Sequence, residues 1–289
     1  MPVIDGVVVV DKAAGWTSHD VVAKCRGIFG QKRVGHAGTL DPGATGVLLV
    51  GLGRVTRLLR YPGALPKTYT GEVAFGTETT TLDDDGEVTA THDMGAVALQ
   101  DVRAAAERFV GDIAQVPPMV SAVKVGGRRL HELARAGTEV VREPRPVTVY
   151  RLTVESGREP NVFTIDVTCS AGTYIRVLAA DLGRALGGGA HLRHLWRMAV
   201  GEFSAGEARP VEALGLDAVL PPAAAMRGYP SVAAGPDVVT EVRHGGVLDA
   251  AALGVEGAGP WAVLDADGAL LAVYEPYDEG RVKPAVVVG

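Results

Sequence analysis

The chain is organised around the stretch GHAGTLDPGATG, residues 35–46, which the apolar run Val47 to Val50 follows directly. Four glycines and one proline in twelve residues exclude a regular helix or a central strand, because glycine permits backbone angles that other residues resist and proline removes a hydrogen-bond donor. The stretch therefore predicts a loop of defined shape. The apolar run predicts a buried strand that anchors this loop.

Asp41, near the middle of this loop, is the only acid between Lys24 and Arg60. Seven lysines and arginines share that interval, and positive neighbours stabilise a carboxylate as the anion. A rigidly held carboxylate on a surface suited to phosphates is what a nucleophile acting on nucleic acid requires. The alternative is that Asp41 only begins a turn, as Asp-Pro pairs often do.

The run GHAGTLDPGATGVL, residues 35–48, resembles the catalytic motif of pseudouridine synthases of the TruB type, the bacterial tRNA pseudouridine-55 synthases. This resemblance implies that Asp41 is the catalytic residue and that His36 occupies the gap left by an extruded base. Residues 12–18 are similar to the opening motif Lys-Pro-x-Gly-x-Thr-Ser, with Ala13 in place of the proline. The similarity implies that Lys12 lies near the substrate.

Two further segments carry the same resemblance. Residues 67–76, KTYTGEVAFG, alternate polar and apolar side chains as a half-buried strand does, and the family motif implies that Tyr69 packs on the target base. Residues 172–176, GTYIR, precede a predicted helix that ends in Asp-Leu-Gly. The resemblance implies that Arg176 pairs with Asp41 and that Tyr174 forms a second wall of the base pocket.

The composition describes a globular protein: 289 residues, 47% hydrophobic and 21% charged. No stretch approaches the roughly 18 consecutive apolar residues of a membrane span, and the N-terminal apolar run lacks the basic lead of a signal peptide. Cys25 and Cys169 form neither a disulfide framework nor a zinc site. We therefore expect a cytoplasmic protein without a metal.

The formal net charge is −6, and residues 230–289 alone account for it with nine acids and three bases. An RNA partner would thus be held by local basic patches of the larger part. Residues 121–151 form one such patch and resemble an insertion that closes over the T-loop of tRNA in the TruB type. The candidate phosphate contacts are basic side chains here and in a second patch before Glu202: Lys124, Arg128, Arg129 and Arg193.

We predict an α+β architecture, the pseudouridine synthase fold, with a mixed central sheet flanked by helices over residues 1–228, including the insertion at 121–151. The prolines and the glycine among residues 221–230 predict a domain boundary. Residues 229–289 are predicted to form a small all-β module that weakly resembles a PUA domain. Asp83, Asp84 and Asp85 fail the calcium-loop pattern and are predicted to form a solvated hairpin turn.

The resulting interpretation is a tRNA pseudouridine(55) synthase that uses Asp41 as nucleophile or base, flips the uridine out and requires no cofactor. Its expected partner is the T-arm of tRNA, and the protein is expected to be a monomer that does not associate with membranes. One alternative is an RNA-binding or tRNA-folding protein with little catalytic role. A carboxylate-dependent glycosidase is another, although such enzymes need two acids and no second acid lies near Asp41 in the sequence.

Overall fold

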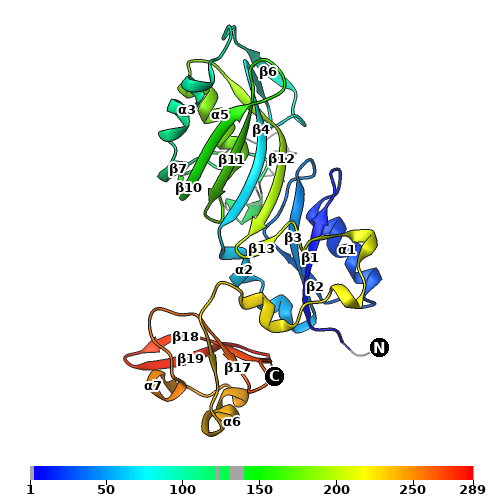
Figure 1. The fold of residues 1–289 in the computed structure, drawn as a ribbon, viewed down its shortest axis with the longest axis vertical. Helices are drawn as coiled ribbons and strands as arrows, with labels where there is room; N and C mark the ends of the chain where they lie inside the picture. Colours follow the sequence, from blue (N-terminus) through cyan, green and yellow to red (C-terminus); the bar gives the residue numbers. More distant parts are fainter. Residues whose placement is uncertain (1–2, 122–123, 126, 130–139, 289) are drawn as a thin grey trace. The chain divides into compact units, whose positions relative to one another are not determined.

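The computed structural model of the chain describes residues 3–121, 124–125, 127–129 and 140–288 (Figure 1). The fold divides into two compact units. The first contains the chain up to residue 42, residues 46–65 and everything from residue 200 onward. The second contains residues 43–45 and 66–199.

The N-terminal part of the first unit is built on a buried hairpin and its neighbours. β1 (Gly6–Lys12) runs antiparallel to β3 (Thr45–Leu52), and β2 (Val34–Ala37) also pairs with β3. Every residue of the run 47–50 is fully buried, which confirms the predicted anchoring strand. Short elements complete this part: η1 (Gly53–Arg57), α2 (Arg60–Ala64), β13 (Phe203–Ser204), β14 (Arg209–Pro210), η2 (Val211–Ala213), η3 (Leu216–Ala218) and η4 (Pro222–Met226).

Helix α1 (Ser18–Ile28) begins directly after Thr17, whose side chain caps it. Thr17 Oγ1 accepts a hydrogen bond from Asp20 N (3.1 Å), and Asp20 Oδ2 accepts one from Thr17 N (2.8 Å). This reciprocal pair satisfies two backbone donors that the first turn leaves open. The Thr17 hydroxyl and amide also hold the pKa of the Asp20 carboxyl below its usual value. The helix buries Val21, Val22 and Cys25.

Residues 231–288 form a five-stranded sheet in the order β15-β17-β18-β19-β16, with two short helices. Its own apolar core includes Trp261 and Tyr274. The elements are β15 (Ser231–Ala233), α6 (Pro236–His244), β16 (Leu248–Asp249), α7 (Ala250–Leu253), β17 (Trp261–Leu264), β18 (Leu270–Asp278) and β19 (Arg281–Val287). The sheet agrees with the predicted β module.

This C-terminal sheet packs on the N-terminal part of the same unit. Val273 and Val286 belong to the apolar cluster that contains Val7 and Leu49. Polar contacts join the same surfaces: the Tyr61 hydroxyl donates to Glu275 Oε1 (2.9 Å), and Arg60, Arg57 and Tyr229 add further hydrogen bonds across the junction. The predicted boundary at residue 228 stays a prediction, and the parts of the chain on its two sides contribute to one apolar cluster.

The second unit is a sheet in the order β12-β4-β11-β10-β7, in which β4, β11, β10 and β7 pair antiparallel (Figure 1). Helix α3 packs against β10 and α5, and a small β5–β6 hairpin follows β4. The bounds are β4 (Lys67–Phe75), β5 (Thr77–Thr79), β6 (Val88–Thr91), α3 (Leu99–Glu107), β7 (Gly111–Gln115), β8 (Lys124–Val125), β9 (Arg128–Arg129), β10 (Arg145–Ser156), β11 (Val162–Cys169), α5 (Ile175–Ala185) and β12 (Ala190–Val200). Antiparallel strands with segregated helices confirm the predicted α+β class.

Candidate active site

Asp41 lies in the connection between the antiparallel strands β2 and β3, and its side chain is partly exposed. Gly38 (φ 76°) and Gly46 (φ 97°) bracket the connection with left-handed backbone angles that favour glycine. The preceding residue, Leu40, is buried, and its amide donates to Ser18 Oγ (2.9 Å). The loop is therefore held on both sides of a carboxylate that can still meet a substrate.

Lys12, at the end of β1, donates a hydrogen bond to this loop. Its side chain is fully buried, and Nζ donates to the carbonyl oxygens of Pro42 (3.1 Å), Trp16 (2.7 Å) and Ala13 (3.0 Å). The amide of Gly15 also donates to Pro42 O (2.9 Å). Lys12 thus ties the family's opening motif to the loop of Asp41, and its predicted contact with substrate stays a prediction.

His36, on β2 ahead of the loop, is half-buried and meets a second imidazole. The ring of His19, at the start of α1, lies edge-on to it with ring centroids 5.3 Å apart and an interplanar angle of 82°. His19 was not among the predicted residues. In the sequence it is marked only by its place next to Ser18. The structure shows that Ser18 accepts the hydrogen bond from Leu40.

Arg176, in the second unit, is a buried guanidinium with 4% of its surface exposed. Nη1 donates to Thr81 O (2.9 Å) and lies 3.4 Å from Asp83 Oδ2, and Nη2 donates to Val120 O (3.0 Å). These contacts hold the plane of the guanidinium in one direction. Asp41 belongs to the other unit, so the pairing of Arg176 with Asp41 stays a prediction.

Tyr69 and Tyr174 lie on different elements of the second unit. Tyr69 lies on the buried face of β4, is 8% exposed and stands opposite Val167 of β11. Tyr174 is partly buried just before α5, where its amide donates to Gln115 Oε1 (2.9 Å) and its carbonyl accepts from Gln115 Nε2 (3.3 Å). Their roles against a base stay predictions.

Lys67 is a buried lysine close to Tyr69 that the sequence did not single out. It lies two residues before Tyr69 on the same buried face of β4 and is 5% exposed. Burial, together with the nearby Arg197 guanidinium, itself 1% exposed, lowers the pKa of its amine to about 8. The signal was the Lys-x-Tyr spacing, because residues i and i+2 of a strand share a face.

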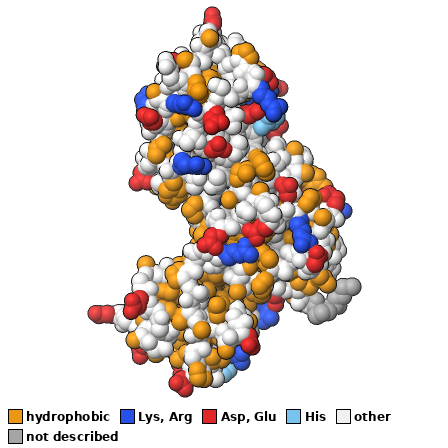
Figure 2. Space-filling view, viewed as in Figure 1, with side chains coloured by type: hydrophobic (Ala, Val, Ile, Leu, Met, Phe, Trp, Pro, Cys, Tyr) orange, Lys and Arg blue, Asp and Glu red, His pale blue; other side chains and the backbone are white. Residues whose placement is uncertain are grey.

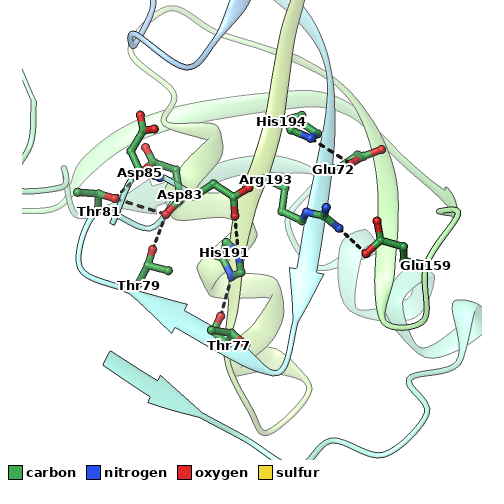
Figure 3. A network of polar contacts seen from close by, with 11 residues as sticks. Glu72, Thr77, Thr79, Thr81, Asp83, Asp85, Glu159, His191, Arg193 and His194 are labelled. Carbon is green, nitrogen blue, oxygen red and sulfur yellow. Dashed lines mark hydrogen bonds and ion pairs between the residues drawn. The ribbon is translucent and has the colours of Figure 1, made fainter. Parts of the chain in front are cut away.

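The acidic segment 83–85 was predicted as a solvated turn, and this prediction was wrong for Asp83. The segment does connect β5 to β6, but the Asp83 side chain is 17% exposed and lies against Arg176. The hydroxyls of Thr79 and Thr81 donate to Asp83 (Figure 3). The pattern of three aspartates could not show this, because the partner is distant in the sequence.

The predicted phosphate contacts have different surroundings. Arg193 Nη1 lies 3.0 Å from Glu159 Oε2, and that hydrogen bond raises the pKa of Arg193 (Figure 3). Lys124, Arg128 and Arg129 lie on the short strand pair β8–β9, and residues 130–139 of the insertion lie outside the described residues. On the face drawn in Figure 2, basic side chains form small groups separated by acidic ones.

Other kinds of site have little support in this part of the chain. Within the described ranges, no three His, Cys, Asp or Glu side chains converge as metal ligands would. Both cysteines are buried free thiols. Among the helices that the structure describes, none is long and apolar enough to cross a membrane. The chemistry available is that of a partly exposed carboxylate, a buried guanidinium and aromatic rings.

Comparison with known proteins identifies relatives over nearly the whole chain. The model of the TruB family pseudouridylate synthase N-terminal domain matches residues 26–175. A tRNA pseudouridine synthase B of Symbiobacterium thermophilum is 50% identical over 247 residues, which cover 84% of this chain and 82% of the relative. A tRNA pseudouridine synthase B of Arthrobacter sp. is 42% identical over 300 residues, which cover 98% of this chain and 96% of the relative. A solved structure of a Cbf5-Nop10-Gar1 complex matches with a TM-score of 0.76 at 26% identity, covering 98% of this chain and 84% of that one.

Proposed function

The chain belongs to the TruB family of pseudouridylate synthases and converts uridine to pseudouridine in tRNA, and we propose that Asp41 begins this reaction at uridine 55 of the T-loop. The observation that carries the proposal is the loop itself. Asp41 is the one acid between Lys24 and Arg60, and Ser18 and Lys12 hold the loop on either side of it. A nucleophilic carboxylate must be held in one direction, and these contacts hold the loop that carries it.

The reaction breaks the bond between ribose C1′ and base N1, turns the base and joins C1′ to C5. The C5 proton leaves to solvent and N1 gains a proton, so the nucleotide keeps its atoms and its oxidation state. No electron or group donor is needed, so we propose that the reaction proceeds without a cofactor. The chain's own residues must bind the tRNA, extrude the uridine and direct the carboxylate.

The remaining site residues have separate roles in this proposal. Arg176 directs the Asp41 carboxylate, because a guanidinium held by three acceptors offers its donors in a fixed plane. Tyr69 and Tyr174 hold the extruded base between flat faces, and His36 fills the space that the base leaves. Lys12 keeps the loop in shape.

The tRNA contacts come from several basic groups that neutralise phosphates without reading sequence. These are Lys124, Arg128, Arg129 and Arg193, on the insertion at 121–151 and on β12. We assign residues 1–228 to the catalytic domain and 229–289 to a PUA-like module. A monomer working on tRNA in the cytoplasm is the expected state, and light scattering with and without tRNA tests it.

Release of tritium from a tRNA transcript labelled at uridine C5 tests the reaction and the residue together. We expect release by the wild type, none by Asp41→Asn, and normal release by Asp11→Asn, a matched change of an exposed aspartate on β1. Turnover by Asp41→Asn would overturn the assignment of Asp41. A transcript with cytidine at position 55 should release no tritium from the T-loop.

The alternative of a binding or folding protein predicts a different result. In that case the folded wild type would bind tRNA and release no tritium from any transcript. A glycosidase would instead act on free nucleosides, which serve as the second substrate in the assay.

A further inference from the structure

His191, on β12, is a buried imidazole for which the proposed reaction has no role. Its residue is 8% exposed, and both ring nitrogens lie at hydrogen-bond distance from oxygen atoms (Figure 3). Nδ1 is 3.0 Å from the carbonyl oxygen of Thr77, the first residue of β5. Nε2 is 3.0 Å from Oδ1 of Asp84, in the segment between β5 and β6.

Both of these partners can only accept hydrogen bonds. A peptide carbonyl has no proton to donate, and an ionised carboxylate has none either. A neutral imidazole carries one N–H, so it can satisfy only one of the two contacts. The arrangement of Thr77, His191 and Asp84 is therefore complete only when the ring is an imidazolium.

The segment that His191 contacts is the one that holds Arg176. Backbone hydrogen bonds join it to β12, from Asp84 N to Leu192 O (3.1 Å) and from Leu192 N to Leu82 O (3.0 Å). From this segment the Thr81 carbonyl and the Asp83 carboxylate reach the Arg176 guanidinium. A continuous series of contacts thus leads from the imidazole of His191 to the guanidinium.

Other titratable and charged groups lie on the elements next to His191. Those of the turn and of β12 are Asp83, Asp84, Asp85 and Arg193 (Figure 3), those of β5 and β6 are Glu78 and His92, and Arg176 of α5 lies against Asp83. His92 and Glu78 already form an ion pair at 3.4 Å, and Arg176 is paired with Asp83. Asp84 is thus the acid that faces the imidazole directly.

We propose that His191, as an imidazolium clamped between Thr77 and Asp84, is a positioning residue that holds segment 81–84 and thereby orients Arg176. This inference rests on the proposed role of Arg176 in directing Asp41. Because His191 lies on β12, loss of one ring proton removes the hydrogen bond that joins β12 either to Thr77 of β5 or to Asp84 of segment 81–84. The reaction then slows without a change in the groups that touch the tRNA.

The test compares single-turnover rate and tRNA affinity in matched variants. His191→Gln and Asp84→Asn each should lower the rate by about tenfold, the effect expected for one charge-assisted hydrogen bond. Both should leave the Kd for tRNA within about twofold, because the lost contact is internal. His194→Gln is the control: it lies on the same strand, its side chain is 70% exposed, and it should keep the wild-type rate.

A double-variant cycle shows whether the effect passes through Asp83. If His191 acts by holding Asp83 on Arg176, adding His191→Gln to Asp83→Asn should slow the reaction no further. Independent, multiplying losses would overturn the proposal. Nitrogen NMR of the histidine rings should show both nitrogens of His191 protonated at the pH of the assay, and a ring with a single proton would also overturn it.

The pH profile separates positioning from mere support of the fold. The wild-type rate should fall as pH rises through the point at which NMR shows His191 losing a proton, and this step should vanish in His191→Gln. A step that persists in the variant contradicts the proposal. Activity in Asp41→Asn would overturn the proposed function. If Asp41→Asn is inactive while His191→Gln and Asp84→Asn are both fully active, only this inference is overturned.

Discussion

The guanidinium of Arg176 lies 3.4 Å from the carboxylate of Asp83, measured from Nη1 to Oδ2, with 4% and 17% of the two side chains exposed. Two residues before Asp83, the carbonyl of Thr81 accepts a hydrogen bond from the same nitrogen. A buried guanidinium is tolerated only when oxygen atoms accept hydrogen bonds or ion pairs from its N–H groups, and here the β5–β6 turn supplies two such oxygens. The turn is thereby part of the candidate active site.

Replacing Asp83 by asparagine should slow pseudouridine formation by about tenfold or more, since a hydrogen bond to a charged group contributes about 1.5–3 kcal/mol. The amide keeps the shape of the carboxylate and removes its charge, so Arg176 is less firmly directed. Single-turnover tritium release measures the effect. Glu87→Gln, an exposed change in the same hairpin, is the control, and an equal loss in both variants would contradict the prediction.

Lys67 should make the stability of the protein depend on pH above neutrality. Burial holds its pKa near 8 in the folded chain, below the value of 10.5 that it regains on unfolding. Between about pH 8 and 10.5 the unfolded chain binds the extra proton, so the contribution of Lys67 to stability rises with pH. The denaturant concentration at the unfolding midpoint of the wild type should therefore rise relative to that of Lys67→Met as pH increases across this interval. A difference between the two midpoints that stays constant with pH would argue against the prediction.

Two helix glycines should respond in opposite ways to alanine. In α5, a Cβ at Gly183 would overlap the backbone nitrogen of Ala190, where β12 begins, so Gly183→Ala should cost about 1–3 kcal/mol. In α1, a Cβ at the exposed Gly27 meets nothing within 4 Å, so Gly27→Ala should add about 0.5–1 kcal/mol. Thermal unfolding measures both. Shifts of Tm in the same direction would show that the space around these residues is not as described.

Both cysteines should resist thiol reagents in the folded protein. Cys25 and Cys169 are fully buried, and burial raises the pKa of each thiol to about 11. At pH 8 only about one thiol in a thousand is then a thiolate, the form that reacts. A colorimetric disulfide reagent should label neither cysteine before unfolding and both after it, so rapid labelling of the native protein would be the contrary result.

The sequence determined those features that depend on neighbours along the chain. The glycines and the proline of residues 35–46 marked the loop that carries Asp41, although residues 35–37 belong to β2 and residues 45–46 to β3. The alternation over 67–75 identified β4 and the buried side of Tyr69. The resemblance to the TruB type then selected Asp41, and the relatives confirmed the family.

The tertiary structure alone decided which distant side chains meet. His191 and Asp84 are 107 residues apart in the sequence, and the Arg176 contact with Thr81 spans 95. Periodicity and capping report only which face or end of an element a residue occupies, whereas these contacts follow from the order in which strands join the sheet. For that reason Asp83, one of three aspartates predicted as a solvated turn, lies against a buried arginine, and Lys67 acquires its lowered pKa from burial and from Arg197.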